Sequence, residues 1–78
     1  MTVSAYVLIQ IEMGKAAEVA GRIRAIDGVD SAEIATGPYD VIARTSAPTM
    51  DDLGRMVVGQ IEMVEGITRT LTCPVINL

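Results

Sequence analysis

The spacing of apolar residues changes along the chain, and each change predicts a new element. Residues 4–12 carry apolar side chains at both odd and even positions, so that both faces of a strand would be apolar. This is typical of a strand covered on both faces at the centre of a sheet. Residues 15–26 instead place apolar side chains at helical spacing, with the charged residues largely off that stripe. Gly28 follows at the point where a helix end favours a left-handed residue.

The middle of the chain predicts a hairpin. Residues 29–36 alternate loosely and include two acidic side chains, which suits an edge strand because charges there discourage unwanted pairing. The segment Gly37-Pro-Tyr-Asp40 has the composition of a turn. Residues 41–46 then resume the strand pattern.

The last third of the chain predicts a second helix and a fourth strand. Thr49 can cap a helix over residues 50–63, whose acidic first turn complements the helix dipole. Residues 67–73 alternate strictly, which predicts a half-buried strand with Thr68, Thr70 and Thr72 on one face and Ile67, Arg69, Leu71 and Cys73 on the other. The tetrapeptide Gln-Ile-Glu-Met occurs at 10–13 and at 60–63, on different predicted elements, and we interpret it as a coincidence.

The order β-α-β-β-α-β predicts an α+β, ferredoxin-like sandwich. In this plan both helices cover one face of a four-stranded antiparallel sheet, and the first and third strands are central. We expect the uncovered face to carry Tyr6 and Leu8, Ile42 and the threonines of residues 67–73. A second copy packed face to face would cover it, so Tyr6, Leu8 and Ile42 are the predicted interface of a homodimer. A ligand or another domain on this face is the alternative.

The composition then narrows the function. The chain has 78 residues, a net charge of -4, no histidine and one cysteine. The acidic balance argues against direct binding of nucleic acid. The absence of histidine argues against a His-based active site, and a single cysteine argues against a metal site of several thiolates. No apolar run reaches the ~20 residues that a membrane helix needs. We therefore expect a cytoplasmic binding module, without cofactor, metal or catalytic residues, rather than an enzyme.

The turn and its surroundings resemble a known family. Thr36-Gly-Pro-Tyr-Asp-Val-Ile42 looks like the Gly-x-Tyr-Asp turn in the effector-binding domain of Lrp/AsnC-family transcription regulators, also called the RAM domain. The segment Gly66-Ile-Thr-Arg-Thr70 and the junction Gly28-Val29 are similar to that family too, so the resemblance covers essentially the whole chain. Family regulators carry an N-terminal helix-turn-helix domain. This sequence starts just before its first strand, so we expect a single, stand-alone RAM domain over residues 1–78.

The resemblance implies a sensor of a free amino acid or a similar small molecule, assembled as a dimer or a ring of dimers. Family members hold the amino acid near the turn, at contacts between dimers, so Gly37, Tyr39, Asp40, Thr68 and Thr70 are the predicted ligand-binding residues. Turn N–H groups suit the ligand carboxylate, and Asp40 suits its ammonium group. Each residue also has a structural explanation. Gly37 can adopt a positive φ, Tyr39 can pack against the turn, and Asp40 can form a hydrogen bond with the turn backbone. The threonines are residues that favour β-strands.

Other functions of this fold are less well matched. Acylphosphatases use a catalytic asparagine, and the one asparagine here is Asn77 at the tail. Dimeric α/β-barrel monooxygenases often rely on histidine or aromatic pockets, and heavy-metal carriers need a Cys-x-x-Cys where residues 11–14 read Ile-Glu-Met-Gly. A ligand-free scaffold that co-assembles with full-length Lrp/AsnC regulators fits the sequence as well as a sensor does.

Overall fold

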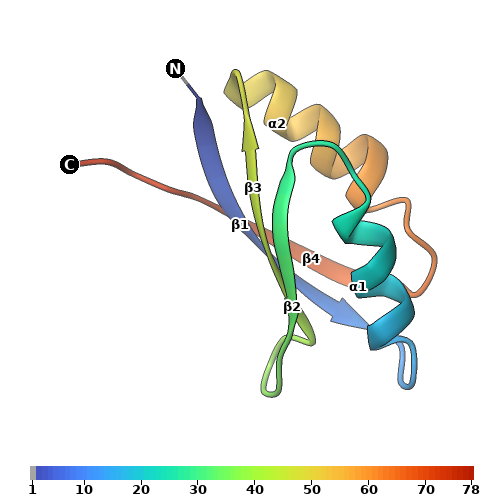
Figure 1. Ribbon diagram of the computed structural model, residues 1–78. Coiled ribbons are helices and arrows are strands. Elements are labelled where there is room, and N and C mark those ends of the chain that lie inside the picture. The colour runs from blue at the N-terminus through green and yellow to red at the C-terminus, as the bar shows by residue number, and fades with distance from the viewer. Residues whose placement is uncertain (1) are drawn as a thin grey trace.

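The computed structural model describes residues 2–78 and has the predicted order of elements. The elements are β1 (Val3–Ile11), α1 (Ala16–Arg24), β2 (Val29–Ile34), β3 (Val41–Ala47), α2 (Met50–Met56), a π-helical continuation η1 (Val57–Ile61), and β4 (Ile67–Pro74). The strands form one antiparallel sheet in the order β2-β3-β1-β4, and both helices lie on one face of it (Figure 1). The ferredoxin-like prediction is therefore confirmed, with β1 and β3 central.

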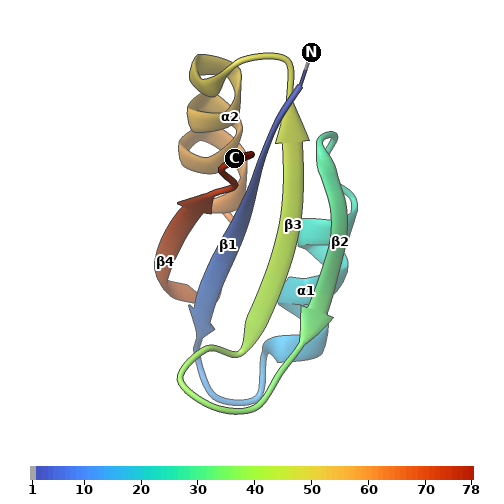
Figure 2. The ribbon, with the colours of Figure 1, turned by 90° about the vertical axis from the view of Figure 1, so that its left-hand side faces the viewer.

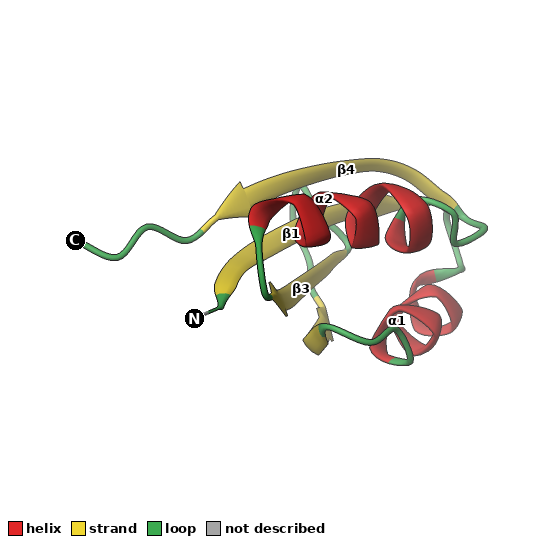
Figure 3. Cartoon of the chain, turned by 90° about the horizontal axis from the view of Figure 1, so that it is seen from above, coloured by secondary structure: helices red, strands yellow, loops and turns green. Residues whose placement is uncertain are grey.

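The core lies between the sheet and the two helices. Ala5, Val7 and Ile9 are fully buried on the helix side of β1, and they pack with buried residues of both helices such as Ile23 and Leu53. The α1 helix lies over β2 and β3, and α2 lies over β3 and β1 (Figure 3). No helix among residues 2–78 has both the length and the apolar character needed to span a membrane.

The second helix is less regular than the sequence predicts. Its start agrees with the prediction, because the Thr49 side chain accepts a hydrogen bond of 3.1 Å from the Asp52 backbone N–H. From Val57 the helix widens into η1, where the Glu62 N–H donates to the Val57 carbonyl at 2.8 Å, five residues back. Gly59 lies within this wide turn, and its missing side chain lowers the preference for regular α-helix.

The prediction for the faces of β4 is wrong, and a β-bulge explains why. Ile11 pairs with Ile67, but Gln10 pairs with Arg69, so Thr68 is an additional residue on β4. Such an insertion reverses which face each later side chain occupies. Thr70 and Thr72 therefore face the helices, opposite Ile9 and Val7, whereas Leu71 and Cys73 lie on the uncovered face opposite Leu8 and Tyr6.

The uncovered face, which we call the open face, is turned toward the viewer in Figure 2. Tyr6, Leu8 and Ile42 lie on it as predicted, because Leu8 pairs with Ile42 and Tyr6 with Arg44. Tyr6, Ile42 and Leu71 are 42%, 37% and 44% exposed. The expectation that β1 is buried on both faces is thus not met within one chain, since the helices cover only one of them.

Candidate ligand-binding site

The predicted turn lies between β2 and β3. Gly37 has φ of +119°, in the region that favours glycine, and a Cβ there would have no atom within 4 Å. The backbone conformation, rather than a lack of space, therefore favours glycine at this position. Tyr39 is half-buried, which fits the packed turn aromatic that is the structural explanation of this residue.

Asp40 ties the turn to the end of β1. Its Oδ2 accepts a hydrogen bond of 2.8 Å from the Ile11 N–H, and its own N–H donates to the Ile9 carbonyl at 2.8 Å. The carboxylate thus continues the hydrogen bonding between β1 and β3 beyond the pair Ile9–Val41. Among residues 2–78, hydrogen bonds to this carboxylate reach Oδ2 alone.

The end of β1 joins the turn to the beginning of β4. The Gln10 side chain donates from Nε2 to the Pro38 carbonyl at 3.0 Å, and the same residue pairs with Arg69 across the sheet. The five predicted residues therefore gather at one end of the molecule, in two groups separated by β1. Gly37, Tyr39 and Asp40 lie on the β3 side, and Thr68 and Thr70 lie on the β4 side.

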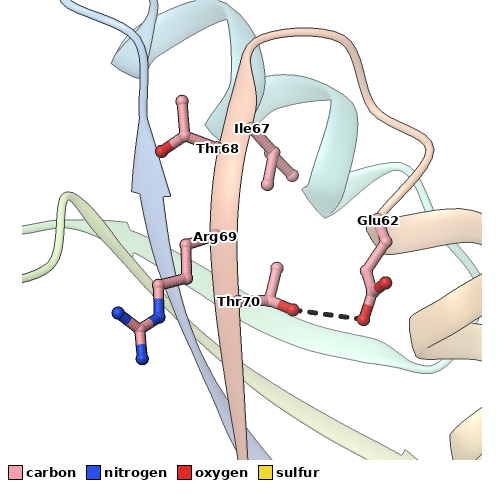
Figure 4. Close-up of a pocket in the computed structure, with 5 residues that line it drawn as sticks. All are labelled: Glu62, Ile67, Thr68, Arg69 and Thr70. Carbon is pink, nitrogen blue, oxygen red and sulfur yellow. Dashed lines mark hydrogen bonds between the residues drawn. The ribbon is translucent and has the colours of Figure 1, made fainter.

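A pocket of about 130 Å³ lies at the beginning of β4. It is lined by Glu62, Ile67, Thr68, Arg69 and Thr70, which include both predicted threonines but none of the turn residues. The Thr70 hydroxyl donates to Glu62 Oε2 at 3.2 Å. In Figure 4, Ile67 and Thr70 project toward Glu62, while Thr68 and Arg69 project to the other side of the strand. A carboxylate beside a hydroxyl can accept hydrogen bonds from a cationic group such as an ammonium.

Sequence reasoning missed Glu62, Ile67 and Arg69 as lining residues. In a regular α-helix, Glu62 would lie about half a turn away from the buried Leu53, at roughly 100° per residue, and would face solvent. In this structure Glu62 is exposed, and its carboxylate still reaches the Thr70 hydroxyl of β4.

Comparison with known proteins agrees with the fold. The family model of the Lrp/AsnC ligand binding domain matches residues 4–78. The match therefore identifies the chain as a ligand-binding domain of the kind found in transcription regulators. It belongs to the Lrp/AsnC family, as its turn and β4 sequences suggested.

Relatives of this chain include transcriptional regulators. An uncharacterised helix-turn-helix-type regulator of Pyrococcus horikoshii is 29% identical over 55 residues, which are 70% of this chain and 37% of the relative. The chain thus spans just over a third of the length of the curated relatives that it matches.

Solved structures give the same fold. The structure of FFRP-DM1 is 30% identical with a TM-score of 0.90, and the match covers 95% of this chain and 99% of that one. A transcriptional regulator of Neisseria meningitidis, solved as a complex with L-Met, is 19% identical with a TM-score of 0.84 over 96% of this chain and 50% of its own. At 19% identity, the comparison with the Neisseria meningitidis regulator shows a shared fold alone.

Proposed function

We propose that this chain is a cytoplasmic effector-binding and oligomerisation module, which binds an amino acid or a similar small molecule and has no enzymatic activity. The observation that carries the proposal is the pocket at the start of β4, where a carboxylate and a hydroxyl lie together. An ammonium group placed there would meet Glu62 and Thr70 at once. The L-Met in the structure of the Neisseria meningitidis regulator supports the choice of ligand class.

The turn would supply the other half of the site. Within one chain β1 separates the turn from the pocket, so Gly37, Tyr39 and Asp40 do not enclose a ligand together with Thr68 and Thr70. We infer that the two groups meet one ligand where dimers join, with the turn of one subunit facing the pocket of another. The turn N–H groups would then meet the ligand carboxylate, and Oδ1 of Asp40 its ammonium.

The open face would form the dimer itself. Tyr6, Leu8 and Ile42 present an apolar surface that solvent covers in a single chain. Packing two such faces together removes that surface from water, which is the main driving force of association. A ring of these dimers would bring turns and pockets together, and the same surfaces would also admit a full-length Lrp/AsnC regulator as partner.

The net charge of -4 supports a role without direct contact to DNA. The module would instead act on gene expression through the regulators with which it assembles. A ligand-free scaffold with the same partners is the alternative, and ligand-dependent stabilisation separates the two, because a molecule that binds only the native state raises its apparent stability.

A thermal-shift screen of the twenty standard amino acids is the test. We expect at least one of them to raise the melting temperature in a concentration-dependent way. If all of them leave it unchanged at millimolar concentration, the sensor proposal is wrong and the scaffold is favoured.

A further inference from the structure

Two carboxylates belong to the proposed ligand site. Glu62 lines the pocket as an exposed residue, and its Oε2 accepts a hydrogen bond from the Thr70 hydroxyl at 3.2 Å. Asp40 lies in the turn that we place against the pocket of another subunit. The ion pairs of residues 2–78 involve neither residue, so within that part of the chain no lysine or arginine nitrogen lies within 4.0 Å of either carboxylate. Neither negative charge is neutralised by a side chain of the same subunit.

The cations near the pocket point elsewhere. Arg69 lines it, but its side chain projects to the other side of β4 from Glu62 (Figure 4). Lys15 lies close to the start of β4, because a Cβ on Gly66 would be 3.2 Å from Lys15 Cδ. Its Nζ, however, is 3.5 Å from the Glu12 carboxylate, with which it forms an ion pair. The side of the pocket that holds Glu62 is therefore negative.

This charge distribution does not suit an amino acid with an uncharged side chain. Such a ligand has one ammonium group, and the turn already offers Asp40 for the ammonium and N–H groups for the carboxylate. A neutral side chain would then cover Glu62 and remove water from its carboxylate without replacing the lost hydrogen bonds, which weakens binding. An acidic side chain would add a second negative charge beside the first.

A basic amino acid brings a second positive charge. The ammonium of lysine or the guanidinium of arginine donates several hydrogen bonds, and it would neutralise the charge of Glu62. The methylene groups of such a side chain suit Ile67, which is half-buried and projects toward Glu62 (Figure 4). Long charged side chains pack their apolar stems in this way and leave the charged end for polar partners.

We propose that the effector of this chain is a basic amino acid, whose side-chain cation binds Glu62 and Thr70 while its α-ammonium and α-carboxylate bind the turn of another subunit. The inference rests on the proposed function and adds the class of the ligand. Glu62 is then the residue that determines specificity, whereas the turn recognises the groups that all amino acids share.

A matched pair of ligands tests the class. L-lysine and L-norleucine have the same α-groups and the same straight carbon chain, but only L-lysine carries the terminal ammonium. Calorimetric titration of the wild-type protein is done at low salt, where charges are least screened. The affinity for L-lysine should be higher by about tenfold or more, as expected for a hydrogen bond to a charged group. L-glutamate should bind more weakly than L-norleucine, because its side chain has the same charge as Glu62.

Two variants test the residue. Glu62→Gln removes the charge and keeps an acceptor for the Thr70 hydroxyl, so the preference for L-lysine should shrink to about threefold or less. Its affinity for L-norleucine should stay the same or rise. Glu65→Gln makes the same charge change at an exposed site in the connection before β4, outside the pocket, and should keep the wild-type preference. An unchanged preference in Glu62→Gln would overturn the role of Glu62.

The outcomes distinguish this inference from the proposed function. If an uncharged amino acid binds the wild-type protein as tightly as L-lysine or more tightly, the ligand class is wrong and the effector-binding module stands. If no standard amino acid binds a folded wild-type protein, the proposed function fails, and the inference that rests on it fails too.

Discussion

Asp40 has a structural role that needs no ligand. Its carboxylate accepts the Ile11 N–H at 2.8 Å in a part-buried position. Hydrogen bonds to charged groups contribute about 1.5–3 kcal/mol, so the residue stabilises the junction of turn and β1 by itself. The proposed ligand contact uses the charge of the same carboxylate, and the two roles are separable by substitution.

Asp40→Asn should separate them. The amide oxygen can still accept the Ile11 N–H, whereas the charge that would meet an ammonium group is gone. We expect the free energy of unfolding to fall by less than about 1 kcal/mol, and ligand affinity to fall by about tenfold or more. Denaturant unfolding measures the first quantity and calorimetric titration the second.

Asp40→Ala provides the control, because it removes the acceptor as well as the charge. Its free energy of unfolding should fall by about 1.5–3 kcal/mol. Its affinity for the ligand should fall as much as that of Asp40→Asn. If Asp40→Asn binds the amino acid as tightly as wild type, Asp40 belongs to the turn alone.

Thr70 and Thr72 form a matched pair for testing the pocket. Both face the helices from β4, but only Thr70 lines the pocket and donates to Glu62. Thr70→Val keeps the shape and removes the hydroxyl, so affinity should fall by about three- to tenfold, as expected for one hydrogen bond. Thr72→Val should bind as wild type does in the same titration. Equal losses in the two variants would show that β4 affects binding through its stability rather than through the pocket.

Much of the architecture could be predicted because it follows from local periodicity. The β1 strand, both helix starts and the hairpin were each indicated by apolar spacing or by cap and turn residues. The faces of β4 could not be predicted, because the bulge at Thr68 depends on the register with β1 and leaves no mark in the alternation of β4 itself.

Part of the candidate site could also be predicted from the sequence, and part could not. The resemblance to a family proposed the turn and two threonines of β4 as ligand-binding residues, and of these Thr68 and Thr70 line the pocket. Glu62 was missed because its contact with Thr70 joins two elements that are far apart in the pattern of apolar residues, and that pattern does not show how the end of α2 and η1 lies against β4.

The glycines at two junctions differ in what surrounds them. Gly28, in the connection between α1 and β2, has φ of +95°, and a Cβ there would lie 3.0 Å from the Ser46 carbonyl oxygen and 3.1 Å from Met56 Cε. Gly37 has φ of +119° and open space around it. Both positions carry backbone strain for any other residue, but only Gly28 is also confined by a neighbouring strand.

Gly28→Ala should therefore destabilise the protein more than Gly37→Ala. Backbone strain costs on the order of 1–3 kcal/mol at either site, and we expect Gly28→Ala to lose about 1 kcal/mol more through displacement of β3. Urea unfolding of the two variants measures the difference. A smaller loss in Gly28→Ala than in Gly37→Ala would contradict the close packing of the connection between α1 and β2 against β3.

The assembled molecule depends on the open face. One chain covers only one side of its sheet, and beyond Val75, whose N–H donates to the Ser4 carbonyl at 2.8 Å, the tail extends away from the helices (Figures 1 and 3). A small domain without a disulfide gains stability from a partner that covers such a face.

Leu8→Asp should dissociate the proposed dimer. Leu8 lies at the centre of the open face, between Ile42 and Leu71, and a charge there would be buried without a partner in the dimer. Circular dichroism should show a folded chain, since solvent reaches this face in the monomer, and light scattering should give a lower mass than that of the wild-type assembly. Ala17→Asp, on the exposed side of α1, should remain dimeric. A dimeric Leu8→Asp would place the interface elsewhere.

The central claim is that this chain binds an amino acid through the pocket and the turn. Calorimetric titration of the wild-type protein with the most stabilising amino acid of the screen tests it most directly. The account predicts saturable binding with one site per chain, which Asp40→Asn and Thr70→Val each weaken and Thr72→Val does not. The absence of saturable binding by a folded wild-type protein, for every standard amino acid, would contradict it.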